Sequence, residues 1–158
     1  MAAHANDLIE MIRERNSSYN DEFYDHMAEE FIEKAKVVIL HEFSNENWVL
    51  HHCSCAIFRL EEWNLLSNEF TVSLAHDWLI PKGETISDDY SEDFINFYEF
   101  LEKAEEYPWP IKCEGWSIET KSEMEAWIKP FVDALTRHGF EVYVDTFCGY
   151  FLSCVINF

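Results

Sequence analysis

The sequence predicts an α+β protein, with about four helices packed on a mostly antiparallel sheet in a single domain of residues 1–158. The chain length of 158 residues is typical of one domain. A composition of 48% hydrophobic and 16% aromatic residues supplies a core and argues against disorder. Helix-period and strand-period segments come in separate groups, unlike the regular alternation of a parallel sheet. The break at Pro81-Lys82-Gly83 leaves a subdivision near residues 81–87 open.

Two helices are predicted at the start of the chain. Asn6 or Asp7 can cap a short helix over residues 7–15, which Asn16-Ser17-Ser18 ends. A longer helix over residues 20–41 has apolar side chains three and four residues apart, which predicts one buried stripe. The stripe consists of Phe23, Met27, Phe31, Ile32, Ala35, Val38 and Ile39.

Five strands are predicted from composition and alternation. Residues 48–60 are rich in strand formers, and residues 70–74 alternate between apolar and polar, so we expect these two strands to pair across residues 61–68. Residues 111–118 predict a third strand. Residues 140–146 and 150–158 predict a closing hairpin with its turn at residues 147–149. Because the last strand is apolar on both faces, we expect it to be central or covered.

Two further helices are predicted in the second half. Residues 88–106 place Tyr90, Phe94, Phe97, Tyr98 and Leu101 on one face, and Pro108 and Pro110 end that helix.

The last helix is the best delimited. Thr120 with Glu123 fits a capping box at its start, and Ser122 with Glu125 is an overlapping alternative. Gly139 suits the left-handed position at its end, and Pro130 predicts a kink or an early start. Its apolar stripe consists of Met124, Trp127, Ile128, Phe131 and Leu135.

The aromatic residues divide into two groups. Those at helical spacing are expected in the core: Phe23, Phe31, Phe94, Phe97, Trp127 and Phe131. Those near breaks or strand ends are expected to be partly exposed: Trp63, Trp78, Trp109 and Trp116. Tryptophan beside an acidic surface is a common composition of protein interfaces, and Trp109 between two prolines is the expected rigid anchor of one.

The strongest functional signal is the charge. The chain has 31 acidic and 11 basic side chains, a net charge of −20, which argues against direct binding to nucleic acid or to an anionic membrane. Residues 61–110 alone hold 13 acidic and 2 basic side chains. On the second predicted helix the carboxylates away from the apolar stripe are Glu22, Asp25, Glu29 and Glu33. On the third they are Asp88, Asp89, Glu92, Asp93, Glu99 and Glu102.

Two interpretations of these carboxylates stay open. They can form a solvated acidic surface with no partner, or a row whose spacing is on the scale of backbone phosphates and which docks into a basic groove. The leading hypothesis is a non-enzymatic protein that uses these carboxylates, with Trp109 and Trp116, to bind and inhibit a nucleic-acid-handling protein. The alternative is a structural or virion assembly component, held by exposed tryptophans and by self-association.

The third hypothesis is a zinc- or thiol-dependent enzyme. On a strand His51, Cys53 and Cys55 would share one face, and thiolate and imidazole are zinc ligands, but no second ligand pair completes the set. Cys148 at the predicted turn, with His138 near in sequence, is a generic thiol–imidazole pair. With four glycines and no phosphate-binding loop, we expect no nucleotide cofactor and no cofactor of another kind.

The sequence also favours an intracellular, cytoplasmic protein. The N-terminus lacks the pattern of a secretory signal, and the longest apolar runs are too short to span a bilayer. Five cysteines, an odd number without disulfide spacing, are expected to be reduced and packed as small apolar residues.

The C-terminal segment resembles a small module of uncharacterised tailed-phage proteins. The resemblance lies in the helix end and step Leu135-Thr136-Arg137-His138-Gly139-Phe140-Glu141-Val142 and in the strand segment Gly149-Tyr150-Phe151-Leu152-Ser153. It implies a viral origin and no catalytic residue. Small acidic viral proteins include inhibitors that occupy the nucleic-acid channels of host nucleases, restriction enzymes, CRISPR effectors or polymerases.

Overall fold

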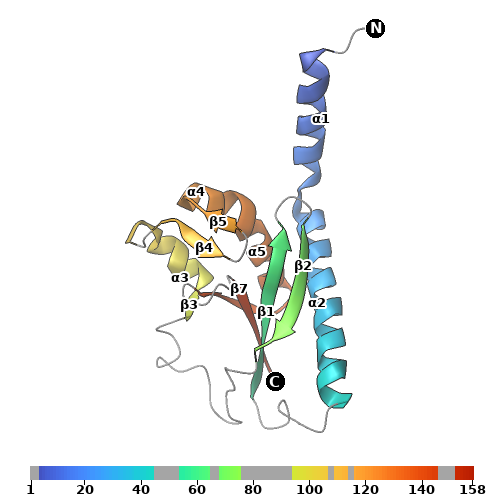
Figure 1. Cartoon of the computed structure of the whole chain (residues 1–158), viewed down its shortest axis with the longest axis vertical. Coiled ribbons are helices and arrows are strands. Elements are labelled where there is room, and N and C mark those ends of the chain that lie inside the picture. The colour runs from blue at the N-terminus through green and yellow to red at the C-terminus, as the bar shows by residue number, and fades with distance from the viewer. Residues whose placement is uncertain are drawn as a thin grey trace.

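The computed structural model describes residues 4–44, 54–64, 68–75, 94–106, 109–113, 116–145 and 152–158. It has the predicted α+β fold, with a five-stranded antiparallel sheet in the order β2-β1-β7-β6-β3 and a two-stranded sheet of β4 and β5 (Figure 1). The strands are β1 (Cys55–Asn64), β2 (Glu69–Leu74), β3 (Phe94–Asn96), β4 (Ile111–Cys113), β5 (Trp116–Ile118), β6 (Glu141–Asp145) and β7 (Leu152–Asn157).

The helices and short helical turns come in three groups, before and between groups of strands. The helices are α1 (Ala5–Ser18), α2 (Asp21–Ser44), α3 (Phe97–Glu102), the 3₁₀ turn η2 (Ala104–Glu106), α4 (Lys121–Glu123), the π turn η3 (Met124–Ile128) and α5 (Lys129–Arg137). The two N-terminal helices are each about three residues longer at their C-terminal ends than predicted. Asn16-Ser17-Ser18 does not end the first helix at residue 15, and its N-cap is His4, whose backbone N–H donates to the Asp7 carboxylate at 3.0 Å.

The C-terminal strand β7 lies at the centre of the sheet, as its apolar composition predicts. It pairs with β1 on one side and with β6 on the other. The pairing of β6 with β7 and of β1 with β2 also confirms the two predicted antiparallel pairs. The predicted turn at residues 147–149 lies outside the described residues.

One face of the sheet carries the main core, under helices α2 and α5. Phe31 of α2 and Phe131 of α5 are fully buried there, over Phe58, Val144 and Leu152 of the strands. The ring of Phe31 stands edge-on to that of Phe140, with ring centroids 5.4 Å apart. Alternation along the strands sends every second side chain into this layer: Ala56, Phe58 and Leu60 of β1, Phe70 and Leu74 of β2, Val142 and Val144 of β6, and Leu152 and Cys154 of β7.

Helix α1 continues beyond this body and projects away from the sheet (Figure 1). None of its residues is buried, and it exposes four large apolar side chains. They are Leu8, Ile9, Met11 and Ile12. The first helix therefore contributes nothing to the core, in contrast to α2.

The predicted helix over residues 88–106 is wrong in part. Residues 94–96 form the edge strand β3, which pairs with β6, and the helix begins at Phe97. Asn96 stops the strand and caps the helix, because its side-chain oxygen accepts a hydrogen bond from the backbone N–H of Tyr98 at 3.0 Å. Residues 88–93 lie outside the described residues.

The predicted strand over residues 111–118 is two strands. Ile111 pairs with Ile118 and Cys113 with Trp116 across an antiparallel ladder, so the chain reverses between them. Both Ile111 and Ile118 are buried against the main core. A small hairpin in this position covers one end of the core, where a single strand of eight residues would have no partner.

Two tryptophans are placed opposite to expectation. Trp63, expected to be partly exposed, is only 5% exposed, because the irregularity in β1 between Glu61 and Asn64 turns it onto the core, with its ring 5.3 Å from that of Phe131. Trp127, expected in the core, is 53% exposed. It lies in the π turn directly before Pro130, which cannot donate the helical hydrogen bond of its position.

Candidate functional site

The acidic side chains predicted on the second helix do lie at the surface of α2, but neighbours compensate several of them. Glu22 and Glu29 lie on either side of His26, at 3.9 and 3.3 Å from its ring nitrogens. Lys36 donates to Glu33 at 2.8 Å. At these exposed positions each contact contributes little stability, although Lys36 offsets the negative charge of Glu33.

Asp25 has a structural role that the sequence did not indicate. Its carboxylate accepts a hydrogen bond from Nη2 of Arg137 at 2.9 Å, and Nε2 of His138 lies 3.5 Å away. The Arg137 guanidinium holds the pKa of this carboxyl below its usual value. Because the pair joins α2 to α5, Asp25 is less available to a partner than Glu22 or Glu29.

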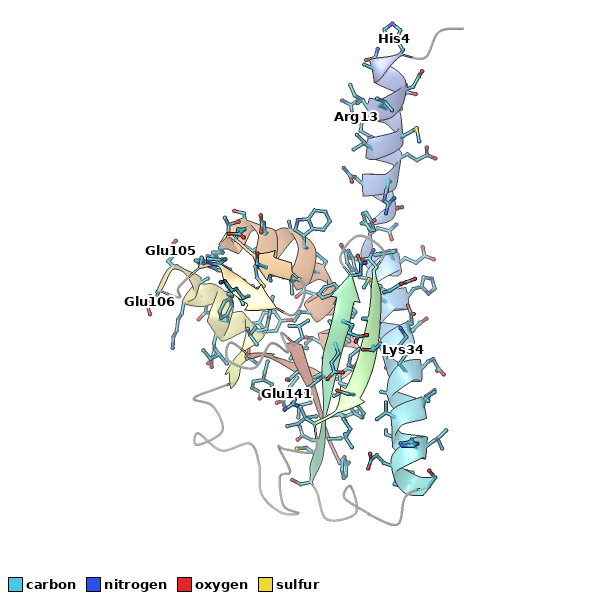
Figure 2. All side chains as sticks on the ribbon, viewed as in Figure 1. His4, Arg13, Lys34, Glu105, Glu106 and Glu141 are labelled. Carbon is cyan, nitrogen blue, oxygen red and sulfur yellow. The ribbon has the colours of Figure 1, made fainter. Side chains whose placement is uncertain are left out.

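The second acidic group lies on α3 and η2. Glu99 and Glu102, both predicted, are exposed there, and Glu105 and Glu106 extend the group along the chain. Figure 2 shows Glu105 and Glu106 at the edge of the molecule, pointing outward. Within the described part of the chain none of these four carboxylates forms an ion pair, and Lys103 is the one basic side chain among them. The other predicted members, Asp88, Asp89, Glu92 and Asp93, lie outside the described residues.

The two acidic groups do not merge into one strip. Helix α2 lies on one side of the molecule and α3 on the opposite side, with the sheet and α5 between them (Figure 1). The described carboxylates of the two helices therefore do not form one continuous row that could imitate a nucleic-acid backbone. The carboxylates Glu99, Glu102, Glu105 and Glu106, called here the α3–η2 carboxylates, form the denser group, with no ion pair among the described residues and one lysine, Lys103, between them.

The predicted anchor Trp109 faces inward. Its indole N–H donates to the carbonyl of Ala104 at 2.8 Å, and its ring stands edge-on to Phe100 with centroids 5.9 Å apart. These contacts hold the segment after η2 against the core, and Trp109 is partly buried and partly exposed, as expected; its role as an interface anchor stays a prediction. The backbone of Trp116 belongs to β5, and its side chain lies outside the described residues.

Of the three candidate zinc ligands, only Cys55 lies in the part of the chain that the structure describes. Cys55 is buried in a small apolar cluster with Ile57, Ala75 and Val155, while His51 and Cys53 lie outside the described residues. No group of three or more His, Cys, Asp or Glu side chains with the geometry of a metal site occurs among the described residues. Cys154 is fully buried too, and burial raises the pKa of its thiol, which keeps it protonated.

Sequence reasoning missed a pocket of about 450 Å³ between the α1–α2 junction and the π turn. The residues that line it include Tyr19, Asp21, Tyr24, Trp127 and Pro130. Burial and the nearby Tyr19 raise the pKa of Tyr24. One sequence feature could have indicated this pocket: the aromatic residues Tyr19 and Tyr24 fall outside the apolar stripe predicted for the second helix.

Comparison with family models, with curated proteins and with solved structures gave no match. Among the described helices, none combines the length and apolar character needed to cross a bilayer.

Proposed function

We propose that the protein is a non-enzymatic interaction protein that uses the α3–η2 carboxylates to bind a basic surface on a nucleic-acid-binding protein and so inhibits it. The observation that carries the proposal is the uncompensated charge of Glu99, Glu102, Glu105 and Glu106 in a chain of net charge −20. Like charges three and four residues apart repel one another by a few tenths of a kcal/mol per pair on a helix. Contact with a cationic partner reduces this repulsion, so the free energy that repulsion costs the free protein is recovered on binding.

The choice of this surface over α2 follows from the ion pairs. His26, Lys36 and Arg137 already lie against the carboxylates of α2. An approaching cationic surface would have to compete with Lys36 for Glu33 and with Arg137 for Asp25. The α3–η2 carboxylates need no such exchange, and their field extends to solvent, where it steers a basic partner toward contact.

The test compares two variants with the same loss of charge. In the first, Glu99, Glu102, Glu105 and Glu106 become glutamine. In the matched control, Glu22, Glu29, Glu30 and Glu33 of α2 become glutamine. Each protein is immobilised, exposed to native cell lysate and eluted along a salt gradient. The proteins that elute are identified, and each is purified and tested for release of a labelled DNA duplex when the acidic protein is added.

The proposal expects a DNA-binding protein that is retained by the wild type and by the α2 variant, elutes as salt rises, and is lost from the α3–η2 variant. The wild type should displace DNA from that protein. Equal retention by all three proteins would overturn the assignment of the surface. Partners that resist high salt, or that keep their DNA in the presence of the wild type, would overturn the function.

A second candidate function is an assembly component, which is favoured by the exposed apolar side chains of α1. In this case self-association would be insensitive to salt and would be lost when Leu8 and Ile12 become serine. Light scattering after size-exclusion chromatography distinguishes this behaviour from a salt-sensitive contact with a basic partner.

A further inference from the structure

The pocket at the α1–α2 junction has the composition of a site for an organic cation. Three aromatic rings line it, from Tyr19, Tyr24 and Trp127, together with the ring of Pro130. The faces of such rings carry negative potential and attract cations, most effectively methylated ammonium groups, which are weakly hydrated and have an apolar outer surface. Its volume of about 450 Å³ lies within the range of small-molecule sites.

Trp127 is the informative member of this lining. Its place in the predicted apolar stripe would bury it, yet the side chain is 53% exposed at the π turn. Turns of this kind occur often at functional sites. A large indole held half in solvent costs hydrophobic free energy, and a bound ligand would recover that cost by covering the ring.

The charge at the pocket also favours a cation. Asp21, at the start of α2, is the acidic residue of the lining. Two basic side chains belong to the same region. Arg137 binds Asp25 at 2.9 Å and also interacts electrostatically with Asp21, and Nε of Arg15 donates to the hydroxyl of Tyr19 at 3.2 Å, so a ligand cation has to compete with these two guanidinium groups. The chain as a whole has a net charge of −20, which raises the local concentration of cations.

We propose that this pocket binds a quaternary ammonium group, stacked against Trp127 with Tyr19 and Tyr24 beside it and Asp21 as the counter-charge. The proposal is independent of the α3–η2 carboxylates. A proline-rich peptide also docks on aromatic grooves, but it carries no charge that would pair with Asp21, so it is the weaker match to this lining. The cation can belong to a free small molecule or to a trimethylated lysine side chain, since both present the same group.

Calorimetric titration of the full-length protein separates these sources. The probes are choline, its neutral isostere 3,3-dimethylbutanol, a short peptide with one trimethyl-lysine and its unmethylated counterpart, and a proline-rich peptide. We expect saturable binding of choline or of the trimethylated peptide. Whichever of the two binds more tightly identifies the source of the cation.

Three variants test the residues. Trp127→Leu removes one ring and is expected to weaken binding about tenfold, since a cation–π contact contributes on this scale. Asp21→Asn, which keeps the shape of the side chain, is expected to weaken it severalfold. Phe158→Leu changes another exposed aromatic, 67% accessible and absent from the pocket lining, and should leave affinity unchanged.

The competing results are equally definite. Equal affinity for choline and its neutral isostere would show an apolar pocket without cation recognition, and a preference for the proline-rich peptide would show a peptide groove. Each of these would overturn the proposal. So would the absence of saturable binding of both cations at millimolar concentration, or retained affinity in Trp127→Leu when its circular dichroism is unchanged.

Discussion

Arg137 at the end of α5 donates to Asp25 on α2 at 2.9 Å, and this pair connects two helices through residues that are 112 positions apart in the sequence. Both helices cover the same face of the sheet, so the contact fixes their relative position at the rim of the core. It also withdraws one of the four predicted acidic residues of α2 from the surface available to a partner.

Replacement of Asp25 by asparagine should lower the melting temperature at neutral pH. The variant loses the negative charge that pairs with Arg137, while the side chain keeps its shape. The folded state lowers the pKa of this carboxyl, so the stabilisation is present above the ordinary aspartate pKa of about 3.9 and disappears as pH falls through the lower folded value. The melting temperatures of wild type and Asp25→Asn, recorded from neutral to strongly acidic pH, should therefore converge at the acid end. Glu22→Gln, at an 82% exposed side chain, is the control and should change little. If the difference in melting temperature between wild type and Asp25→Asn persisted unchanged in acid, it would contradict a stabilising role for the Asp25 charge.

Phe31→Ala should be among the most destabilising single changes in α2. The side chain is fully buried between the helix and the sheet, edge-on to Phe140, and its removal leaves a cavity as well as lost burial. We expect a loss of about 3–5 kcal/mol in the free energy of unfolding, measured by urea denaturation. Phe158→Ala, at an exposed ring, should stay within about 0.5 kcal/mol of wild type. A similar loss in both variants would show that Phe31 does not pack as described.

The features that the sequence predicted correctly are those set by local chemistry. The 3.6-residue period placed Phe31 and Ala35 in the core, and apolar residues on both faces placed β7 at the centre of the sheet. Gly139 adopts a positive φ of 104° at the end of α5, as the left-handed C′ position requires. In each case neighbours in the sequence determine the outcome.

The features that were missed depend on residues far apart in the sequence. Trp63 is buried because Phe131 lies above it, and Asp25 is paired because Arg137 arrives from another helix. The compensation of Glu33 by Lys36, three residues apart, could have been inferred from spacing alone, whereas the separation of α2 from α3 could not. The aromatic pocket could not be predicted for the same reason, because Tyr19 and Tyr24 meet Trp127 only in the folded chain.

The sequence at the start of α4 offers two capping boxes, and in the structure Thr120 is the N-cap, while the Glu123 carboxylate accepts from the backbone N–H of Glu119 instead of that of Thr120. Oγ1 of Thr120 accepts a hydrogen bond from the backbone N–H of Glu123 at 3.2 Å. Thr120→Ala should therefore cost about 1 kcal/mol in chemical denaturation, because an N-terminal donor loses its acceptor. The matched variant Ser122→Ala, at the position of the alternative box, should be close to neutral. If Ser122→Ala were the more destabilising of the two variants, Ser122 would be the residue that caps this helix in solution.

The last prediction concerns alkaline pH. Tyr143 is half buried in β6, and its hydroxyl donates to Glu141 at 3.0 Å; burial and this carboxylate raise its pKa to about 12. The folded state thus favours the neutral phenol, and the resulting stabilisation is complete below pH about 10, the ordinary pKa of tyrosine, and is lost as pH rises toward 12. Phenylalanine at position 143 does not titrate, so the free energy of unfolding should fall less steeply over this interval in Tyr143→Phe than in the wild type.

In Glu141→Gln the Tyr143 pKa should lie lower, because the anionic acceptor is gone while burial remains. The decline of the free energy of unfolding with pH should therefore be intermediate. Phenolate absorbance followed along the same titration checks the assignment, and identical slopes for wild type and Tyr143→Phe would refute it.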